Sequence, residues 1–89
     1  MNEEIIPITS RDYWFKVVAY LQQNWALLDS DERGATVWFI GDTSWVFDQM
    51  SFPSAEEALR ALTRNGFRRL ADDEKAQRVL SLPKPPFRR

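Results

Sequence analysis

The sequence has 89 residues and no cysteine, so no disulfide can hold its fold together. A chain of this length forms one domain with one hydrophobic core, and its stability has to come from packing, helped in some proteins by oligomerisation. The four tryptophans matter for this reason, because each is either buried in a small core or used at a surface. The sequence predicts a single packed domain.

Histidine is also absent, which removes most enzyme chemistry. Without His or Cys there is no imidazole base, no Ser-His-Asp or Cys-His nucleophile and no zinc site of the usual nitrogen and sulfur type. Of the two acids that flank the aromatic segment, Asp42 lies in a turn, where Asp is common for backbone reasons, and Asp48 lies on a strand. We therefore expect no catalytic residue, no cofactor and no metal site, and predict that the protein is not an enzyme.

The acidic segment from Asp29 to Gly34 matches the first half of a calcium-binding loop. The match then fails, because the fifth position is Arg33 and the twelfth is Ile40, where the loop requires oxygen ligands. The segment is interpreted as a solvated turn between a helix and a strand.

Apolar residues recur at helical spacing from residue 12 to about residue 28. Thr9 and Ser10 are N-cap candidates, and Asp12 would lie in the first turn, where the helix dipole favours a carboxylate. One stripe of this helix would carry five large residues: Trp14, Val18, Leu21, Trp25 and Leu28. The pattern predicts a long amphipathic N-terminal helix.

The segment from residue 35 to residue 50 predicts a β-hairpin. Ala35 to Ile40 and Trp45 to Met50 are rich in β-branched and aromatic residues, and residues 41–44 have the composition of a turn. Both faces of this hairpin carry apolar bulk. Because an isolated hairpin is marginal in water, we expect a third strand, a dimer partner, or helices over both faces.

A capped helix follows the hairpin. Ser54 and Glu57 form a capping box, and Gly66 is in position for a left-handed C-cap, after which Phe67 should fold back onto Leu62. Residues 67–70 are a candidate for a short third strand.

The last part of the chain predicts a short helix and a tail. Asp72 or Asp73 would cap the helix, with Ala76, Val79 and Leu80 facing inward. Three prolines in residues 83–89 prevent this segment from continuing as a helix.

Together these elements predict a small single α+β domain. Its parts are the long N-terminal helix, the β-hairpin with its candidate third strand, the capped helix and the short C-terminal helix. The domain would span residues 1–82, and residues 83–89 would form a C-terminal tail rich in Pro and Arg.

Charge is distributed unevenly along the chain. Residues 1–57 contain ten acidic and three basic residues, whereas residues 58–89 contain nine basic and three acidic residues. Guanidinium groups bind phosphate and carboxylate in a bidentate manner. Two interpretations stay open: an ordinary solvated surface paired with the acidic half, or a site for nucleic acid or another anion formed by Arg60, Arg64, Arg68, Arg69, Arg88 and Arg89.

The leading functional prediction is a non-enzymatic protein-binding module. Trp38, Ile40 and Trp45 of the aromatic hairpin would contact an unknown protein partner or a second copy of the chain, because tryptophan is frequent among the residues that dominate protein interfaces. Binding of nucleic acid or another anion through the arginine-rich half is the alternative.

No stretch approaches the roughly 20 apolar residues that a membrane-spanning helix needs. The N-terminal sequence MNEEIIPIT is acidic where a secretory signal would be basic. We therefore expect a cytoplasmic protein without a membrane partner.

Overall fold

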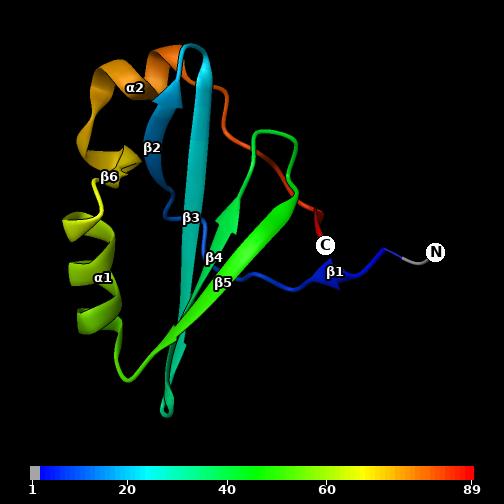
Figure 1. The fold of residues 1–89 in the computed structure, drawn as a ribbon, viewed down its shortest axis with the longest axis vertical. Coiled ribbons are helices and arrows are strands. Elements are labelled where there is room, and N and C mark those ends of the chain that lie inside the picture. The colour runs from blue at the N-terminus through cyan, green and yellow to red at the C-terminus, as the bar shows by residue number, and fades with distance from the viewer. Residues whose placement is uncertain (1–2) are drawn as a thin grey trace.

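The computed structural model describes residues 3–89, and the first two residues of the acidic N-terminus lie outside this range. Figure 1 shows a twisted antiparallel sheet with strand order β5-β4-β3-β2-β6, and a second sheet in which β1 pairs with β7. The elements in chain order are β1 (Ile5–Ile6), β2 (Trp14–Ala19), β3 (Gln22–Asp31), β4 (Gly34–Ile40), β5 (Val46–Phe52), α1 (Ala55–Arg64), β6 (Arg68–Arg69), the 3-10 turn η1 (Leu70–Asp72), α2 (Glu74–Val79) and β7 (Phe87–Arg88).

The predicted long N-terminal helix is wrong, because this segment forms strands β2 and β3 joined by a two-residue turn. Phe15 pairs with Trp25 and Trp14 pairs with Ala26, so the first pair lies on one face of the sheet and the second pair on the other. Residues of the predicted helical stripe are thus divided between two faces. The domain is mainly a five-stranded sheet rather than a helix packed on a hairpin.

The turn between β2 and β3 explains this error. Two-residue hairpin turns usually contain Gly, Asn or Asp, but this turn consists of Tyr20 and Leu21. The strands on either side are apolar on both faces, so they lack the alternation that distinguishes a strand from a helix. The apolar residues assigned to one wide helical surface lie on the two faces of a sheet and on the exposed turn between β2 and β3.

The hairpin and the capped helix are present. β4 and β5 pair as predicted but lie within the larger sheet. The Ser54 hydroxyl accepts a hydrogen bond from the Glu57 N–H (3.2 Å), and the Phe67 N–H donates to the Leu62 carbonyl (2.9 Å), so α1 has both predicted caps. The candidate third strand is β6, which pairs with β2 at the edge of the sheet opposite β5.

The predicted C-terminal helix is α2. Its N-cap Asp73 accepts a hydrogen bond from the Ala76 N–H (2.9 Å), and Ala76 is buried. Val79 is exposed, so its predicted inward position is wrong. The inward positions belong to Ala76 within the helix and to Leu80, its C-cap residue, whereas Val79 points away from that side.

Both faces of the sheet carry a core. On the face that we call the tail face, the sheet residues Phe15, Trp25, Leu27, Ile40 and Val46 pack against Ile6, Ile8, Ala76 and Phe87. On the opposite helix face, Ala26, Ala35 and Val37 pack against Ala58, Leu62 and Phe67. The hairpin is therefore covered by other strands of the sheet, by α1 on one face and by the terminal segments on the other.

Residues 83–89 are part of this packing. Phe87 is almost completely buried in the tail-face core. The Tyr13 hydroxyl donates a hydrogen bond to the Pro83 carbonyl (2.7 Å), and the Ser44 hydroxyl donates to the Lys84 carbonyl (2.6 Å). The proline-rich segment is thus fixed along the sheet on its way to β7.

The buried Tyr13 hydroxyl predicts a loss of stability in alkali. Burial raises the pKa of Tyr13 above its usual value, and the Arg11 guanidinium opposes this shift. Since the folded protein holds the phenolic proton more tightly than the unfolded chain, this contribution is complete below about pH 10 and is lost as pH rises through the folded pKa. Urea denaturation at increasing pH should show a smaller alkaline loss in Tyr13→Phe than in the wild type. Identical pH profiles would contradict this.

Candidate interaction surface

The structure separates the three hairpin residues that the sequence suggested as a contact surface. Ile40 is completely buried in the tail-face core, and Trp38 is partly buried against the same core. The Trp38 indole N–H is buried and has no hydrogen-bond partner within residues 3–89. Trp45 is 45% exposed. Of the three, only Trp45 is therefore a large side chain that is exposed to solvent.

A β-bulge in β5 brings other residues to the surface. Ile40 pairs with Val46, but the preceding residue Phe39 pairs with Asp48, so Phe47 is an extra residue in β5. The bulge shifts the alternation of side chains between the two faces of the sheet by one residue. As a result, Phe47, Asp48 and Met50 all lie on the helix face. Phe47 is 52% exposed and Met50 is 49% exposed. We call Trp45, Phe47 and Met50, with Asp48 among them, the β5 surface.

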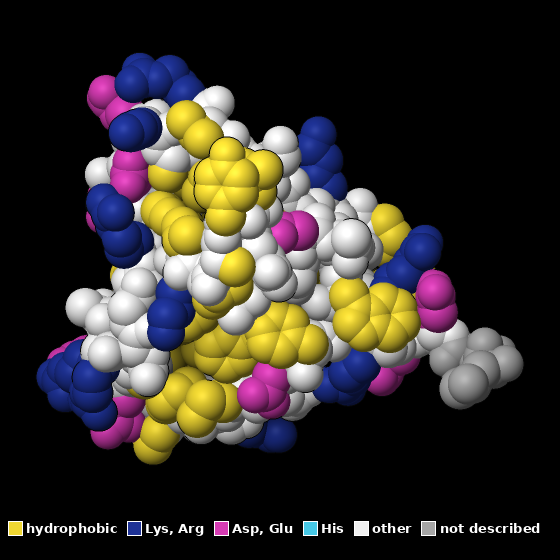
Figure 2. Space-filling view, turned by 45° about the horizontal axis from the view of Figure 1, so that its top comes forward, with side chains coloured by type: hydrophobic (Ala, Val, Ile, Leu, Met, Phe, Trp, Pro, Cys, Tyr) yellow, Lys and Arg dark blue, Asp and Glu magenta, His cyan; other side chains and the backbone are white. Residues whose placement is uncertain are grey.

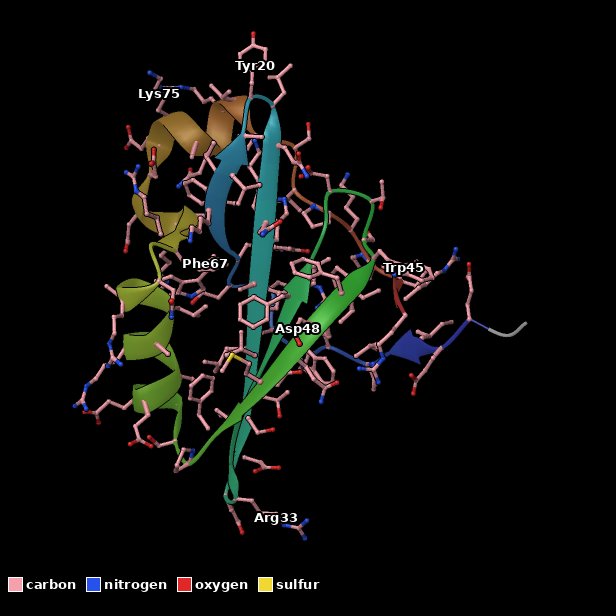
Figure 3. The ribbon with its side chains drawn as sticks, viewed as in Figure 1. Tyr20, Arg33, Trp45, Asp48, Phe67 and Lys75 are labelled. Carbon is pink, nitrogen blue, oxygen red and sulfur yellow. The ribbon has the colours of Figure 1, made fainter. Side chains whose placement is uncertain are left out.

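Sequence reasoning missed Phe47 and Met50. Period two placed Phe47 and Met50 on opposite faces, and the sequence of β5 contains no glycine or proline that would mark the bulge. Figure 3 shows Trp45 near one end of β5 and Asp48 near its middle. Figure 2 shows hydrophobic side chains gathered over the middle of the molecule, with Lys and Arg side chains mainly around the border.

Phe47 is held by a row of aromatic rings. The Phe39 ring lies 6.4 Å from the Phe47 ring and 5.7 Å from the buried Phe67 ring, measured between centroids. Such contacts restrict the exposed side chain. A partner that contacts Phe47 would therefore meet a pre-ordered ring, which lowers the entropic cost of binding.

The backbone edge of β5 is protected against pairing with another strand. The Asp48 carboxylate accepts a hydrogen bond from the Gln49 N–H (2.8 Å), and the Gln49 side chain accepts one from the Arg89 guanidinium. A bulge, an acidic side chain and an occupied N–H all oppose edge-to-edge association. The β5 surface is thus suited to contact through its side chains.

The six candidate arginines lie on three separate elements. Arg60 and Arg64 are on α1, Arg68 and Arg69 form β6, and Arg88 and Arg89 belong to the C-terminal segment. Within residues 3–89 no acid lies within ion-pair distance of Arg64. The other five have acidic partners, namely Arg60 with Glu56, Arg68 with Asp73 (2.8 Å), Arg69 with Asp12 (2.7 Å), Arg88 with Glu3 (3.4 Å) and Arg89 with Glu4 (3.1 Å).

The Arg69 pair illustrates the local balance of charge. The Arg69 guanidinium donates a hydrogen bond to the Asp12 carboxylate, and this bond, together with the charge of the carboxylate, raises the pKa of Arg69 above its usual value. Exposed pairs of this kind add little stability, but they reduce the positive potential that would attract a polyanion.

Several carboxylates hold the backbone. Asp42 accepts hydrogen bonds from the Trp25 indole N–H (2.9 Å) and the Gln23 N–H (3.3 Å). Asp29 accepts from the N–H groups of residues 9 and 10, and Asp31 accepts from those of residues 33 and 34.

Asp29 and Asp31 line a hollow of about 340 Å³ beside Trp38. Within residues 3–89, no group of three or more acidic side chains is placed to hold a metal ion.

A scan against protein-family models, a search of curated proteins and a search of solved structures each found no match. In the part of the chain that the structure describes, no helix is long and apolar enough to cross a membrane.

Proposed function

We propose that the protein is a non-enzymatic binding module that contacts another protein through the β5 surface, with a second copy of the chain as the partner. The observation that carries this proposal is the exposure of Phe47 and Met50 in the edge strand β5 and of Trp45 directly before it. Three large apolar side chains in water on neighbouring positions of a small domain are typical of an interaction surface.

Three features support contact between copies. Each copy presents the same apolar side chains, so a two-fold arrangement buries them in a self-complementary way. Phe47 is pre-ordered by Phe39, and Met50 has a flexible thioether side chain that adapts to its neighbours. The protected edge of β5 favours a closed contact between faces over open-ended strand addition.

No observation favours nucleic-acid binding by the arginine-rich half as strongly as the exposed β5 surface favours contact with a protein. Five of its six candidate arginines have acidic partners within the molecule, and the six are divided among three elements. An enzyme is likewise not proposed, because Asp29, Asp31 and Asp42 already accept hydrogen bonds that shape the backbone.

Sedimentation velocity tests the proposal. The wild type should show reversible self-association, and the double variant Phe47→Ser/Met50→Ser should weaken it by at least about tenfold, because both side chains leave the contact. The control Leu59→Ser/Val79→Ser removes two exposed apolar side chains on α1 and α2, away from β5, and should associate like the wild type.

Two results would contradict the proposal. A wild type that remains monomeric at about 1 mM protein would exclude self-association of useful strength. Equal association in the wild type and the Phe47→Ser/Met50→Ser variant would place the contact elsewhere.

A further inference from the structure

Met50 is the one sulfur-containing residue among residues 3–89, and it lies in the β5 surface. The chain has no cysteine, and its other methionine is Met1, which lies outside the described range. Met50 is 49% exposed, so an oxidant in solution reaches its side chain. Among residues 3–89, the side chain that peroxide oxidises most readily is therefore part of the proposed contact.

The position of Met50 in the sheet divides its surroundings into an apolar part and an open part. Met50 pairs with Val37 of β4, which is completely buried in the core of the helix face, and it lies on the same face as Asp48. The side chain thus rests beside this core and is open to solvent on its outer side. A second copy that meets the β5 surface would cover the open side.

We propose that oxidation of Met50 to methionine sulfoxide by hydrogen peroxide separates the copies. This inference rests on the function proposed for the β5 surface. In the reaction, the Met50 sulfur attacks one peroxide oxygen, and an S–O bond forms as the O–O bond breaks. The other oxygen leaves as hydroxide, which takes the proton of the new S–OH group and becomes water. The sulfur loses the two electrons that the peroxide gains.

The sulfoxide opposes association because its oxygen is polar. In a free copy this oxygen accepts hydrogen bonds from water, whereas a contact between copies would remove that water and surround the oxygen with apolar side chains. The Asp48 carboxylate on the same face is itself a hydrogen-bond acceptor and offers the sulfoxide no donor. In a two-fold contact the cost arises in both copies.

Oxidation should leave the fold intact, because Met50 is half exposed and the sulfoxide oxygen stays in water in the free copy. Urea denaturation of the oxidised protein should therefore give a midpoint close to that of the untreated protein. Since association covers Met50, peroxide attacks the free copy, and oxidation of Met50 should become slower as the protein concentration rises.

Peroxide treatment followed by sedimentation velocity tests this inference. Tryptic peptide masses identify the oxidised methionine, because Met50 lies in the peptide 34–60 and Met1 in the peptide 1–11. Protein that carries sulfoxide at Met50 should associate at least about tenfold more weakly than untreated protein, as expected when a polar group is buried without a partner. Reduction by methionine sulfoxide reductases should restore the association.

Two variants separate oxidation at Met50 from other effects of peroxide. Met50→Leu keeps a similar apolar volume without sulfur, so it should associate like the wild type both before and after treatment. Met50→Gln introduces a polar side chain without any oxidant and should associate as weakly as the oxidised wild type.

The outcomes distinguish this inference from the function on which it rests. If the untreated wild type associates and the protein oxidised at Met50 associates equally, the inference is overturned while the β5 contact stands. Treated protein in which Met50 remains unmodified, or a treated Met50→Leu variant that loses association, would also overturn the inference alone. An untreated wild type that does not associate would overturn the proposed function and this inference with it.

Discussion

Phe87→Ala is expected to lower the free energy of unfolding by about 3–5 kcal/mol, as large-to-small changes of buried aromatic residues do. Phe87 is one of the largest completely buried side chains and lies in the core with Trp25 and Ile40. The Arg11 guanidinium also lies 5.3 Å from the centre of its ring. Because small domains have a total stability of about 5–15 kcal/mol, this single change should remove a large part of it. Urea denaturation followed by tryptophan fluorescence measures the loss.

The neighbouring Arg88→Ala variant is the matched control. Arg88 is also in β7, but its side chain is exposed and forms an ion pair with Glu3 (3.4 Å). Exposed pairs contribute about 0–1 kcal/mol, so this variant should stay close to the wild type. A Phe87→Ala protein that loses less than about 1 kcal/mol would show that the tail does not complete the core, since even a single buried methylene contributes about that much.

Gly34→Ala is expected to destabilise the protein by about 2–4 kcal/mol, from backbone strain and from overpacking together. Gly34 has a φ of 151°, which side chains of L-residues rarely adopt. A methyl group at this position would overlap the carbonyl oxygen of Phe52, which is backbone and cannot rotate away. The substitution should therefore disturb the turn between β3 and β4 as well as the end of β5.

Gly41→Ala serves as the control for Gly34→Ala. A methyl group on Gly41 would lie 3.8 Å from the Trp45 carbonyl oxygen, which is an ordinary contact, and Gly41 does not have a positive φ. Thermal unfolding of the two variants should differ clearly, with Gly34→Ala less stable. Equal melting temperatures would show that the chain near Phe52 moves to accept the methyl group.

Elements with local capping signals could be predicted from the sequence. The Ser54 hydroxyl, the Gly66 turn and the Asp73 carboxylate each act within a few residues of their own helix, so α1 and the start of α2 were correct. These interactions need no knowledge of distant segments. The short strand β6 was also recognised, although its partner β2 was not.

The N-terminal strands could not be predicted because the deciding interactions are non-local. Phe15 and Trp25 are buried only when the Tyr20–Leu21 turn pairs their strands and the tail brings Phe87 over them. Those apolar residues also fit a helical stripe, and the turn lacks glycine and asparagine. The tertiary structure, rather than local preference, determines the conformation of this segment.

The proposed contact surface depends on non-local interactions as well. The sequence left open whether Trp38 and Trp45 are exposed or buried, and in the structure Trp45 is exposed whereas Trp38 is partly buried. The rest of the β5 surface depends on the bulge at Phe47, which is defined by the pairing of Phe39 with Asp48 and has no marker in the sequence. Ile40 lies on the tail face. It is buried there because the tail, rather than solvent or a partner, covers this face.

Two-dimensional ¹H–¹⁵N NMR spectra over a dilution series test the central claim most directly, because they report association residue by residue. If copies meet through the β5 surface, the amide signals of residues 45–50 should shift with protein concentration, whereas those of Lys75 and Val79 in α2 should not. Spectra that do not change with concentration, or shifts confined to segments other than β5, would contradict it.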